Sequence, residues 1–273
     1  DFGQSYRDGR DIREKISGKM KWSLMLSVLS LFLAYLVAIP TGVYTAYYAG
    51  GRFDRISTPI LFGLYSMPGF FVGTILLVLF ANPDVLDWFP ASGVRDPSVF
   101  NPEWPFYQRV LHYLPFLVLP IATYFYSSIA FISRLVRSGM LAEFSAPYIR
   151  TARAKGLKEV RIIWVHAFRN NLLPLITLLS SSIPFMFSGS VIIETIFSIP
   201  GMGLETYQSV TTYDYPMIIA LFTLFGFFHG NFGLPNPFFC LVFSPQKNRI
   251  SGGDLRPPMA KISGSGCAGH HAG

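Results

Sequence analysis

Charged residues are scarce in this 273-residue chain, because Asp, Glu, Lys and Arg together make up 14% of it; soluble domains carry about a quarter. Hydrophobic residues make up 51% and aromatic residues 16%, and the mean hydropathy is +0.40. A soluble core of this size has no room for so much apolar surface, whereas lipid accepts it. The composition excludes an ordinary soluble domain and indicates a membrane protein.

Motifs of catalysis and metal binding are also lacking. The two cysteines, Cys240 and Cys267, have a spacing typical of neither a disulfide framework nor a metal site. The sequence has no G-x-x-x-x-G-K-[ST] phosphate loop, no H-E-x-x-H and no G-x-S-x-G. We therefore predict no catalytic residue, metal site or cofactor in this chain, so any ATP and Mg²⁺ would be used by another protein.

The net charge of +7 is not spread over a polar surface, as nucleic-acid binding requires. The Lys and Arg residues cluster between apolar runs, which is the pattern of membrane topology. We predict a lipid bilayer as the environment and no nucleic-acid partner.

Long apolar runs dominate the chain. A membrane-spanning helix needs about 20 apolar residues, and we predict spans at residues 22–51, 56–83, 110–133, 170–193 and, shorter, 215–228. The sequence thus predicts an all-α polytopic membrane protein. Residues 227–273, rich in Gly, Ser and Pro from 233 onward, are predicted to be an atypical tail, either disordered or non-native.

The connections between these runs differ in charge. Residues 134–169 carry eight Lys and Arg against Glu143 and Glu159, and residues 82–109 carry two against four acids. The positive-inside rule places 134–169 and the turn near 49–57 in the cytoplasm, and 82–109 and 198–214 outside. Alternation then places 1–21 outside, although it holds six Lys and Arg against four acids. The larger bias of the central loop decides the orientation.

The basic loop 134–169 also contains a predicted helix of about two turns between Pro147 and Gly156, with Arg150 and Arg153 on one face. A second, amphipathic helix is expected at 158–171. From the residues alone, this loop is either a topology signal or a docking element for a cytoplasmic partner.

Several motifs in this order resemble those of ABC importer permeases, in the dipeptide, oligopeptide and nickel branch. They are Tyr148-Ile-Arg-Thr-Ala-Arg-Ala-Lys-Gly-Leu157, His166-Ala-Phe-Arg-Asn-Asn-Leu-Leu-Pro174, Phe89-Pro-Ala-Ser-Gly93, Gly189-Ser-Val-Ile-Ile-Glu194, Phe197-Ser-Ile-Pro-Gly-Met-Gly203 and Asp214-Tyr-Pro216. The likeness runs from Asp1-Phe-Gly-Gln-Ser5 to about Gly226. The general family motif begins Glu-Ala-Ala where this chain has Arg150, Thr151 and Ala152, a variant that looks like the peptide branch.

The resemblance implies a type I ABC importer transmembrane domain at 22–226, with five of six helices present and the first missing, after an extracytoplasmic segment at 1–21. It implies a multi-pass protein of the bacterial inner membrane. Its implied partners are a second permease subunit, identical or not, two cytoplasmic ABC ATPase subunits and an extracytoplasmic solute-binding protein. The implied ATPase-coupling residues are Tyr148, Ile149, Arg150, Thr151, Ala152, Arg153, Ala154, Lys155, Gly156 and Leu157.

Glu194 is the one acid bordering the fourth apolar run. At 1.5 Å per residue it lies about 33 Å beyond Leu172, so we expect an interfacial residue near the outer surface. With Pro200, Gly201 and Gly203 it is a candidate for an outer gate or a contact with the binding protein.

Two other functions compete with a permease subunit for peptides or similar small solutes. An ion-coupled secondary transporter needs ionisable groups near the bilayer midplane, and the four long runs contain no Asp, Glu, Lys or Arg. A membrane-embedded enzyme has less support, because its motifs are absent. The residues leave open whether the solute is a peptide, nickel or a glycoside.

Overall fold

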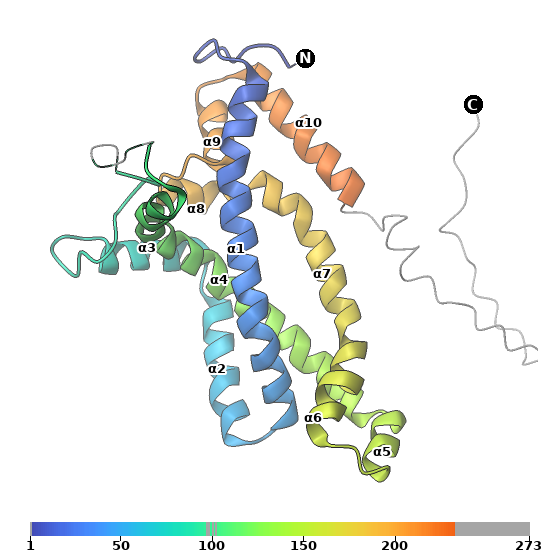
Figure 1. Ribbon diagram of the computed structural model, residues 1–273. Coiled ribbons are helices and arrows are strands. Elements are labelled where there is room, and N and C mark those ends of the chain that lie inside the picture. Colours follow the sequence, from blue (N-terminus) through green and yellow to red (C-terminus); the bar gives the residue numbers. More distant parts are fainter. Residues whose placement is uncertain (1, 97–98, 100, 102, 233–273) are drawn as a thin grey trace, which may run out of the picture. The chain divides into compact units, whose positions relative to one another are not determined.

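The computed structural model describes residues 2–96, 99, 101 and 103–232. The chain divides into two units, Asp1–Asn236 and Pro237–Gly273, and the described residues all belong to the first. Apart from an isolated bridge between Gln4 and Asp11, the regular structure of these residues is helical. The helices are α1 (Ile12–Tyr47), α2 (Arg52–Ser66), α3 (Gly69–Phe80), α4 (Phe106–Ser145), α5 (Pro147–Ala154), α6 (Glu159–Arg161), the π-helical turn η1 (Ile162–Ala167), α7 (Phe168–Ser188), α8 (Val191–Ile196), α9 (Met202–Thr211) and α10 (Tyr215–Phe232) (Figure 1).

Three helical stretches of the described residues are long and apolar enough to cross a membrane: Ile12–Tyr47, Phe106–Ser145 and Glu159–Ile196. The first begins at Asp11, whose carboxylate accepts the backbone N–H of Arg13 at 2.7 Å. Both α1 and α4 continue through internal prolines, which membrane helices tolerate when neighbouring groups satisfy the freed carbonyls.

The second predicted span, 56–83, is not one helix. The chain bends by 97° between α2 and α3. Pro68 is the cause, because its ring pushes the preceding residue out of the helical region, and Met67 is extended at φ −85° and ψ 128°. Figure 1 shows α3 turning away from the direction of α2.

The fifth run also differs from its prediction. Helix α10 passes through Phe228, His229 and Gly230 and continues to Phe232, so the chain does not leave helical structure at residue 227. Its apolar part, Tyr215–Asn231, is shorter than the three long stretches. The rest of the predicted tail, 233–273, lies outside the described residues.

A stripe of small residues lets α1 pack closely on α4. Every fourth residue along the buried side of α1 is small: Ser30, Ala34, Ala38, Gly42 and Ala46. A Cβ on Gly42 would lie 2.6 Å from the Cβ of Val136, too close for any side chain. Small residues at such spacing allow membrane helices to approach each other at the backbone.

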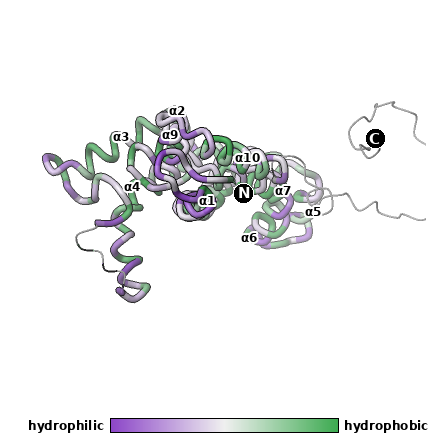
Figure 2. The backbone as a smooth tube through the Cα atoms, turned by 90° about the horizontal axis from the view of Figure 1, so that it is seen from above, coloured by the Kyte–Doolittle hydropathy of each residue, from purple (hydrophilic) through white to green (hydrophobic). Residues whose placement is uncertain are grey.

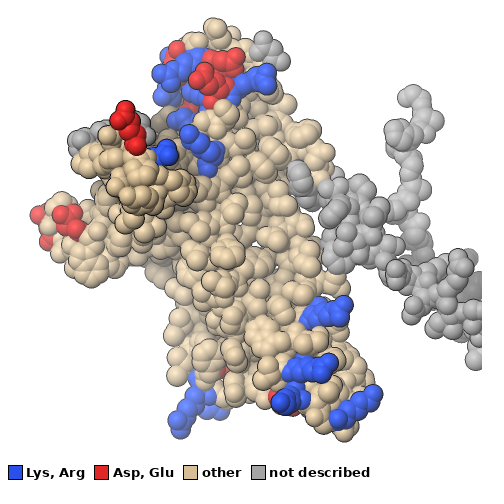
Figure 3. Space-filling view, viewed as in Figure 1, with Lys and Arg blue, Asp and Glu red and all other residues tan. Residues whose placement is uncertain are grey.

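Apolar side chains also cover the outside. Several large apolar side chains are more than half exposed, as lipid-facing residues are: Phe32, Leu36, Phe70, Leu111 and Phe185. Figure 2 shows the hydrophobic (green) stretch of α3, whose sequence contains no charge. In Figure 3 most charged side chains gather at the two ends of the described unit, and a few acidic ones lie on a protrusion at the left; the surface between is largely uncharged. This arrangement fits a protein that crosses a bilayer.

Candidate functional site

The short helix α5 forms one end of the described unit (Figure 1). Pro147 stands at its first position, where a missing N–H costs nothing. The helix ends before Gly156, whose φ of +75° lies in the left-handed region that glycine adopts most readily. The predicted helix of two turns between these residues is confirmed.

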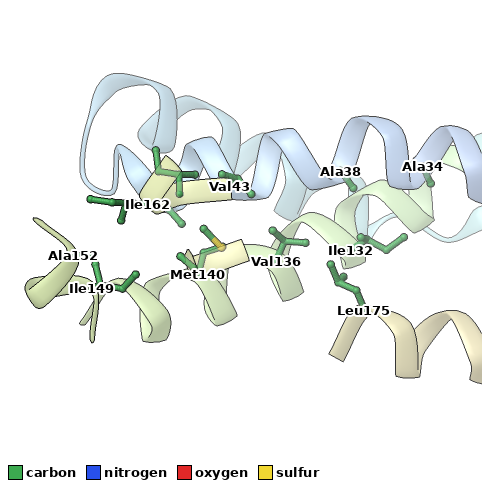
Figure 4. Packing of buried hydrophobic residues seen from close by; sticks show 13 residues of the cluster. Ala34, Ala38, Val43, Ile132, Val136, Met140, Ile149, Ala152, Ile162 and Leu175 are labelled. Atoms are coloured by element: carbon green, nitrogen blue, oxygen red, sulfur yellow. The ribbon is translucent and has the colours of Figure 1, made fainter. Parts of the chain in front are cut away.

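The inner side of α5 is anchored in the hydrophobic core. Ile149 is fully buried and Ala152 is 8% exposed, and both join a cluster with Met140 of α4 and Ile162 of η1. Figure 4 shows these side chains together, with Val43 of α1 nearby. Helix α5 therefore cannot shift independently of the helices that carry it without losing this packing.

Polar contacts hold α5 at both of its ends. The Tyr148 hydroxyl donates to Glu143 at the end of α4, and the Asn170 side chain donates to the Tyr148 oxygen at 3.0 Å. Burial raises the pKa of the Tyr148 phenol above its ordinary value, and the hydrogen bond to Glu143 adds to the rise, so the phenol stays neutral and donates. At the other end, the guanidinium of Arg153 donates to Glu159 at 3.0 Å.

The outer side of α5 is basic and exposed. Of the ten residues predicted to couple to an ATPase, Ile149 and Ala152 are buried and Leu157 is partly buried, and the other seven are exposed. Arg150, Arg153 and Lys155 give this surface its charge. Figure 3 shows Lys and Arg side chains at this end of the unit. The helix thus presents a positive surface on a rigid base.

A charge pair joins α2 to α4 nearby, which the sequence did not reveal. The guanidinium of Arg137 donates to both oxygens of Asp54 at 2.9 Å, and the Gly50 N–H and Thr58 hydroxyl donate to the same carboxylate at 2.9 Å. Each oxygen of the Asp54 carboxylate thus accepts two hydrogen bonds, and the ion pair holds the turn between α1 and α2 against α4.

The predicted outer residues Glu194, Pro200, Gly201 and Gly203 come together. The side chain of Glu194 is fully buried inside the protein, which the sequence did not indicate. Helix α7 ends at Ser188, and Gly189 at φ +68° turns the chain into α8. The estimate from a straight helix fails because the helix stops.

The buried carboxylate of Glu194 ties three segments together. The Ser23 hydroxyl of α1 donates to its Oε1 at 2.7 Å, and the Leu204 N–H of α9 donates to its Oε2 at 3.0 Å. The Ser23 oxygen in turn accepts the Met202 N–H at 2.8 Å. We call Glu194, Ser23 and the backbone N–H groups of Met202 and Leu204 the outer latch.

Glycines line the outer latch because nothing larger fits. A Cβ on Gly189 would lie 2.3 Å from Glu194 Oε1, and a Cβ on Gly201 would lie 2.4 Å from Oε2. A Cβ on Gly203 would meet the backbone of Ser190 at 2.5 Å. The glycine-rich turn is thus required by the buried acid that it encloses.

The N-terminal segment docks beside this region through paired charges. Lys15 contacts Glu205 at 2.9 Å and Asp8 at 3.3 Å, and Lys19 contacts Glu205 at 3.3 Å. The Ser5 hydroxyl and the Tyr6 N–H (3.0 Å) both donate to Asp214. Two of the six Lys and Arg of residues 1–21, Lys15 and Lys19, thus share the carboxylate of Glu205. Part of the positive charge that conflicts with the predicted topology is therefore paired locally.

Comparison with known proteins identifies relatives along most of the chain. Residues 38–234 match the family described as "Binding-protein-dependent transport system inner membrane component". A solved structure described as inward-facing conformations of the MetNI methionine ABC transporter is similar, with a TM-score of 0.56 and 15% identity over 78% of this chain and 91% of that one. At this identity the likeness establishes the fold.

Curated relatives are more similar in sequence. The chain is 34% identical over 230 residues to the inner membrane ABC transporter permease protein YejB of Escherichia coli O157:H7, covering 83% of this chain and 63% of that protein. It is 38% identical over 223 residues to the oligopeptide transport system permease protein AppB of Bacillus subtilis, covering 81% and 67%. The chain thus spans about two thirds of the length of these relatives, 63% for YejB.

Proposed function

Because the chain belongs to the family of binding-protein-dependent transport system inner membrane components, we propose that it acts as the permease subunit of an ATP-driven ABC importer of peptides. It is a multi-pass protein of the bacterial inner membrane. The observation that carries the proposal is α5, a short helix with a buried inner side and an exposed basic outer side, clamped between α4 and α7. Such an element passes force between a partner and the membrane helices.

The proposed partners are the other subunits that an ABC importer needs. A second permease subunit completes the path, two ATPase subunits on the cytoplasmic side bind and hydrolyse ATP with Mg²⁺, and a solute-binding protein delivers the solute from outside. The segment Tyr148 to Leu157 couples to an ATPase through its seven exposed residues, and its buried residues Ile149 and Ala152 anchor it. Closure of the ATPases draws the two α5 helices together, and the anchored helices α1, α4 and α7 follow.

Co-purification tests the ATPase contact, with Gly156→Asp as the disruptive variant. Gly50→Asp is its matched control, because both glycines have positive φ (+75° and +77°) and open space around the added side chain. Both variants thus add the same strain and the same charge. We expect Gly156→Asp to lose the ATPase and Gly50→Asp to retain it. Retention by both variants, or loss in the correctly inserted wild type, refutes the proposal.

The outer latch is proposed to act in the outer gate. Its residues Glu194, Gly201 and Gly203, with Pro200 beside them, connect α1 to the α8–α9 turn, so opening the path outward changes this junction. Because Glu194 is fully buried, only its exposed neighbours can contact the binding protein. A normal transport rate in Glu194→Gln would remove Glu194 from the gate.

An ion-coupled carrier makes a different prediction about energy supply. Such a mechanism could use Glu194, the buried acid that borders the fourth apolar run, yet both of its oxygens already accept hydrogen bonds. In proteoliposomes, uptake by the complete complex should require ATP and persist when an ionophore abolishes ion gradients. Uptake that needs the gradient and not ATP would favour the carrier.

A further inference from the structure

Arg134 of α4 holds its guanidinium over two aromatic rings. Its Cζ lies 4.1 Å from the ring centroid of Phe62 and 5.2 Å from that of Tyr65, both on α2. Stacking on a ring face fixes the plane of the guanidinium but uses none of its N–H donors. Among the described residues no carboxylate forms an ion pair with Arg134. The N–H donors of Arg134 are thus held in place without an acceptor from the residues that the structure describes.

The neighbouring Arg137 provides the contrast. It lies one turn further along α4 and spends its donors on both oxygens of Asp54. Helix α4 therefore carries one Arg that forms an ion pair within the protein and one Arg that only stacks on aromatic rings.

A hollow of about 390 Å³ opens at Arg134, between α2 and α4. Phe62, Tyr65 and Phe131 supply apolar walls, and Thr58, Ser133 and Ser138 supply hydroxyls. The three hydroxyls donate within the protein, to Asp54, Ala38 and Leu135. Arg137 also lines the hollow but is paired with Asp54. Within the described part of the chain, the strong donor that remains for a ligand is the Arg134 guanidinium, whose planar fork matches a carboxylate.

The depth of Arg134 favours a solute over a lipid headgroup. Phe62 lies eight residues beyond Asp54 along α2, about 12 Å further from the cytoplasmic turn at 1.5 Å per residue. Side chains of a helix lean toward its N-terminus, and α4 begins on the outer side in the predicted topology. From the edge of the predicted cytoplasmic segment 134–169, the Arg134 side chain thus leans toward the bilayer, whereas an Arg that snorkels to inner headgroups leans the other way.

We propose that the hollow at Arg134 binds the carboxylate of a transported solute, and that this solute is a peptide with a free C-terminal carboxylate. The inference rests on the proposed function and adds the chemical group that is recognised. Phe62 and Tyr65 act as positioning residues, since they orient the guanidinium that contacts the ligand.

Uptake by the complete transporter in proteoliposomes tests this site, with tri-alanine and tri-alanine amide as probes. Arg134→Gln should slow tri-alanine uptake roughly tenfold, the effect of one lost hydrogen bond to a charged group, and slow amide uptake far less. Arg109→Gln is the control, because Arg109 is an exposed Arg at the other end of the same helix. An equal loss for both peptides, or no loss, overturns the proposal.

A second measurement needs neither ATP nor the binding protein. With Cys240 and Cys267 replaced by Ser, a Phe131→Cys variant carries a thiol at the hollow and keeps both rings that hold Arg134. Tri-alanine should slow its reaction with a maleimide and the amide should not, and protection should disappear when Arg134→Gln is added. Equal protection by both probes, or none, overturns the carboxylate site.

The two measurements separate the possible failures. A wild-type complex without ATP-dependent uptake refutes the proposed function, while thiol protection still decides the site. Liposomes with and without phosphatidylglycerol distinguish the source of the anion. A defect of Arg134→Gln that follows this lipid and ignores the peptide terminus assigns the hollow to a headgroup and overturns the proposal.

Discussion

The side-chain oxygen of Asn171 stands where a methyl group on Gly139 would lie, since an ideal Cβ on Gly139 falls 1.8 Å from Asn171 Oδ1. The Asn171 amide also donates to the Val136 carbonyl at 3.1 Å. This contact joins α4 to α7 close to the point where both helices lead to α5. The spacing of the two helices that hold α5 thus depends on a glycine.

Gly139→Ala is expected to destabilise the protein, because Asn171 must move and lose its hydrogen bond. Overpacking of this kind costs about 1–3 kcal/mol. Thermal unfolding in detergent measures it. Gly226→Ala on α10 is the control, since its Cβ meets open space and alanine favours the helix. Adding Asn171→Ala to Gly139→Ala should relieve the clash, so additive losses would contradict this explanation.

Ser23→Ala should weaken the outer latch. It removes the donor to Glu194 Oε1 and the acceptor of the Met202 N–H in one step. Each buried group left unsatisfied costs about 1–3 kcal/mol. Ser127→Ala is the control, because Ser127 is exposed and bonds only to the Tyr124 carbonyl of its own helix. Equal unfolding temperatures for the two variants would show that water replaces the Ser23 hydroxyl.

The helical framework could be predicted because apolar runs long enough to cross a membrane can be read directly from the sequence. The stripe of small residues at Ser30, Ala34, Ala38, Gly42 and Ala46 was not predicted, although its spacing of four residues is a local pattern that locates the side of α1 that meets α4. The short helix between Pro147 and Gly156 was predicted because Pro and Gly mark helix ends locally.

What the sequence left unpredicted depends on contacts between distant residues or on local breaks. Ser23 and Glu194 are 171 residues apart, so the sequence around either residue does not predict the hydrogen bond between them. The burial of Glu194 follows from the turn at Gly189, which an extrapolated straight helix ignores. The bend at Pro68 was missed because several other prolines of this chain lie inside unbroken helices.

Acidification should release the N-terminal segment from Asp214. Burial alone would raise the pKa of this carboxyl, but hydrogen bonds from Ser5 and from the Tyr6 and Met217 N–H groups outweigh it, so the pKa lies below its ordinary value. A lowered folded-state pKa stabilises docking at pH values above the unfolded pKa of about 3.9, and this stabilisation is lost as the pH falls through the folded value.

The anisotropy of a dye at Phe2→Cys, with Cys240 and Cys267 replaced by Ser, measures this release. We expect a constant value from pH 7 to about 5 and a fall below about 4, as the Asp214 carboxylate is protonated. Asp214→Asn should show a lower anisotropy already at pH 7. A pH profile identical in both proteins would show that other groups hold the segment.

Ile149→Ala and Arg150→Glu, at adjacent positions of α5, should separate anchoring from coupling. Ile149 is fully buried and Arg150 is exposed, so truncating Ile149 leaves a cavity while changing Arg150 leaves the core intact. We expect Ile149→Ala to lower the free energy of unfolding by about 2–5 kcal/mol. Arg150→Glu should leave stability within about 0.5 kcal/mol of the wild type and lose the co-purified ATPase, because it reverses a charge on the proposed contact surface. If Arg150→Glu retains the ATPase, the basic side of α5 is not the contact, and if Ile149→Ala is as stable as the wild type, the core does not anchor the helix.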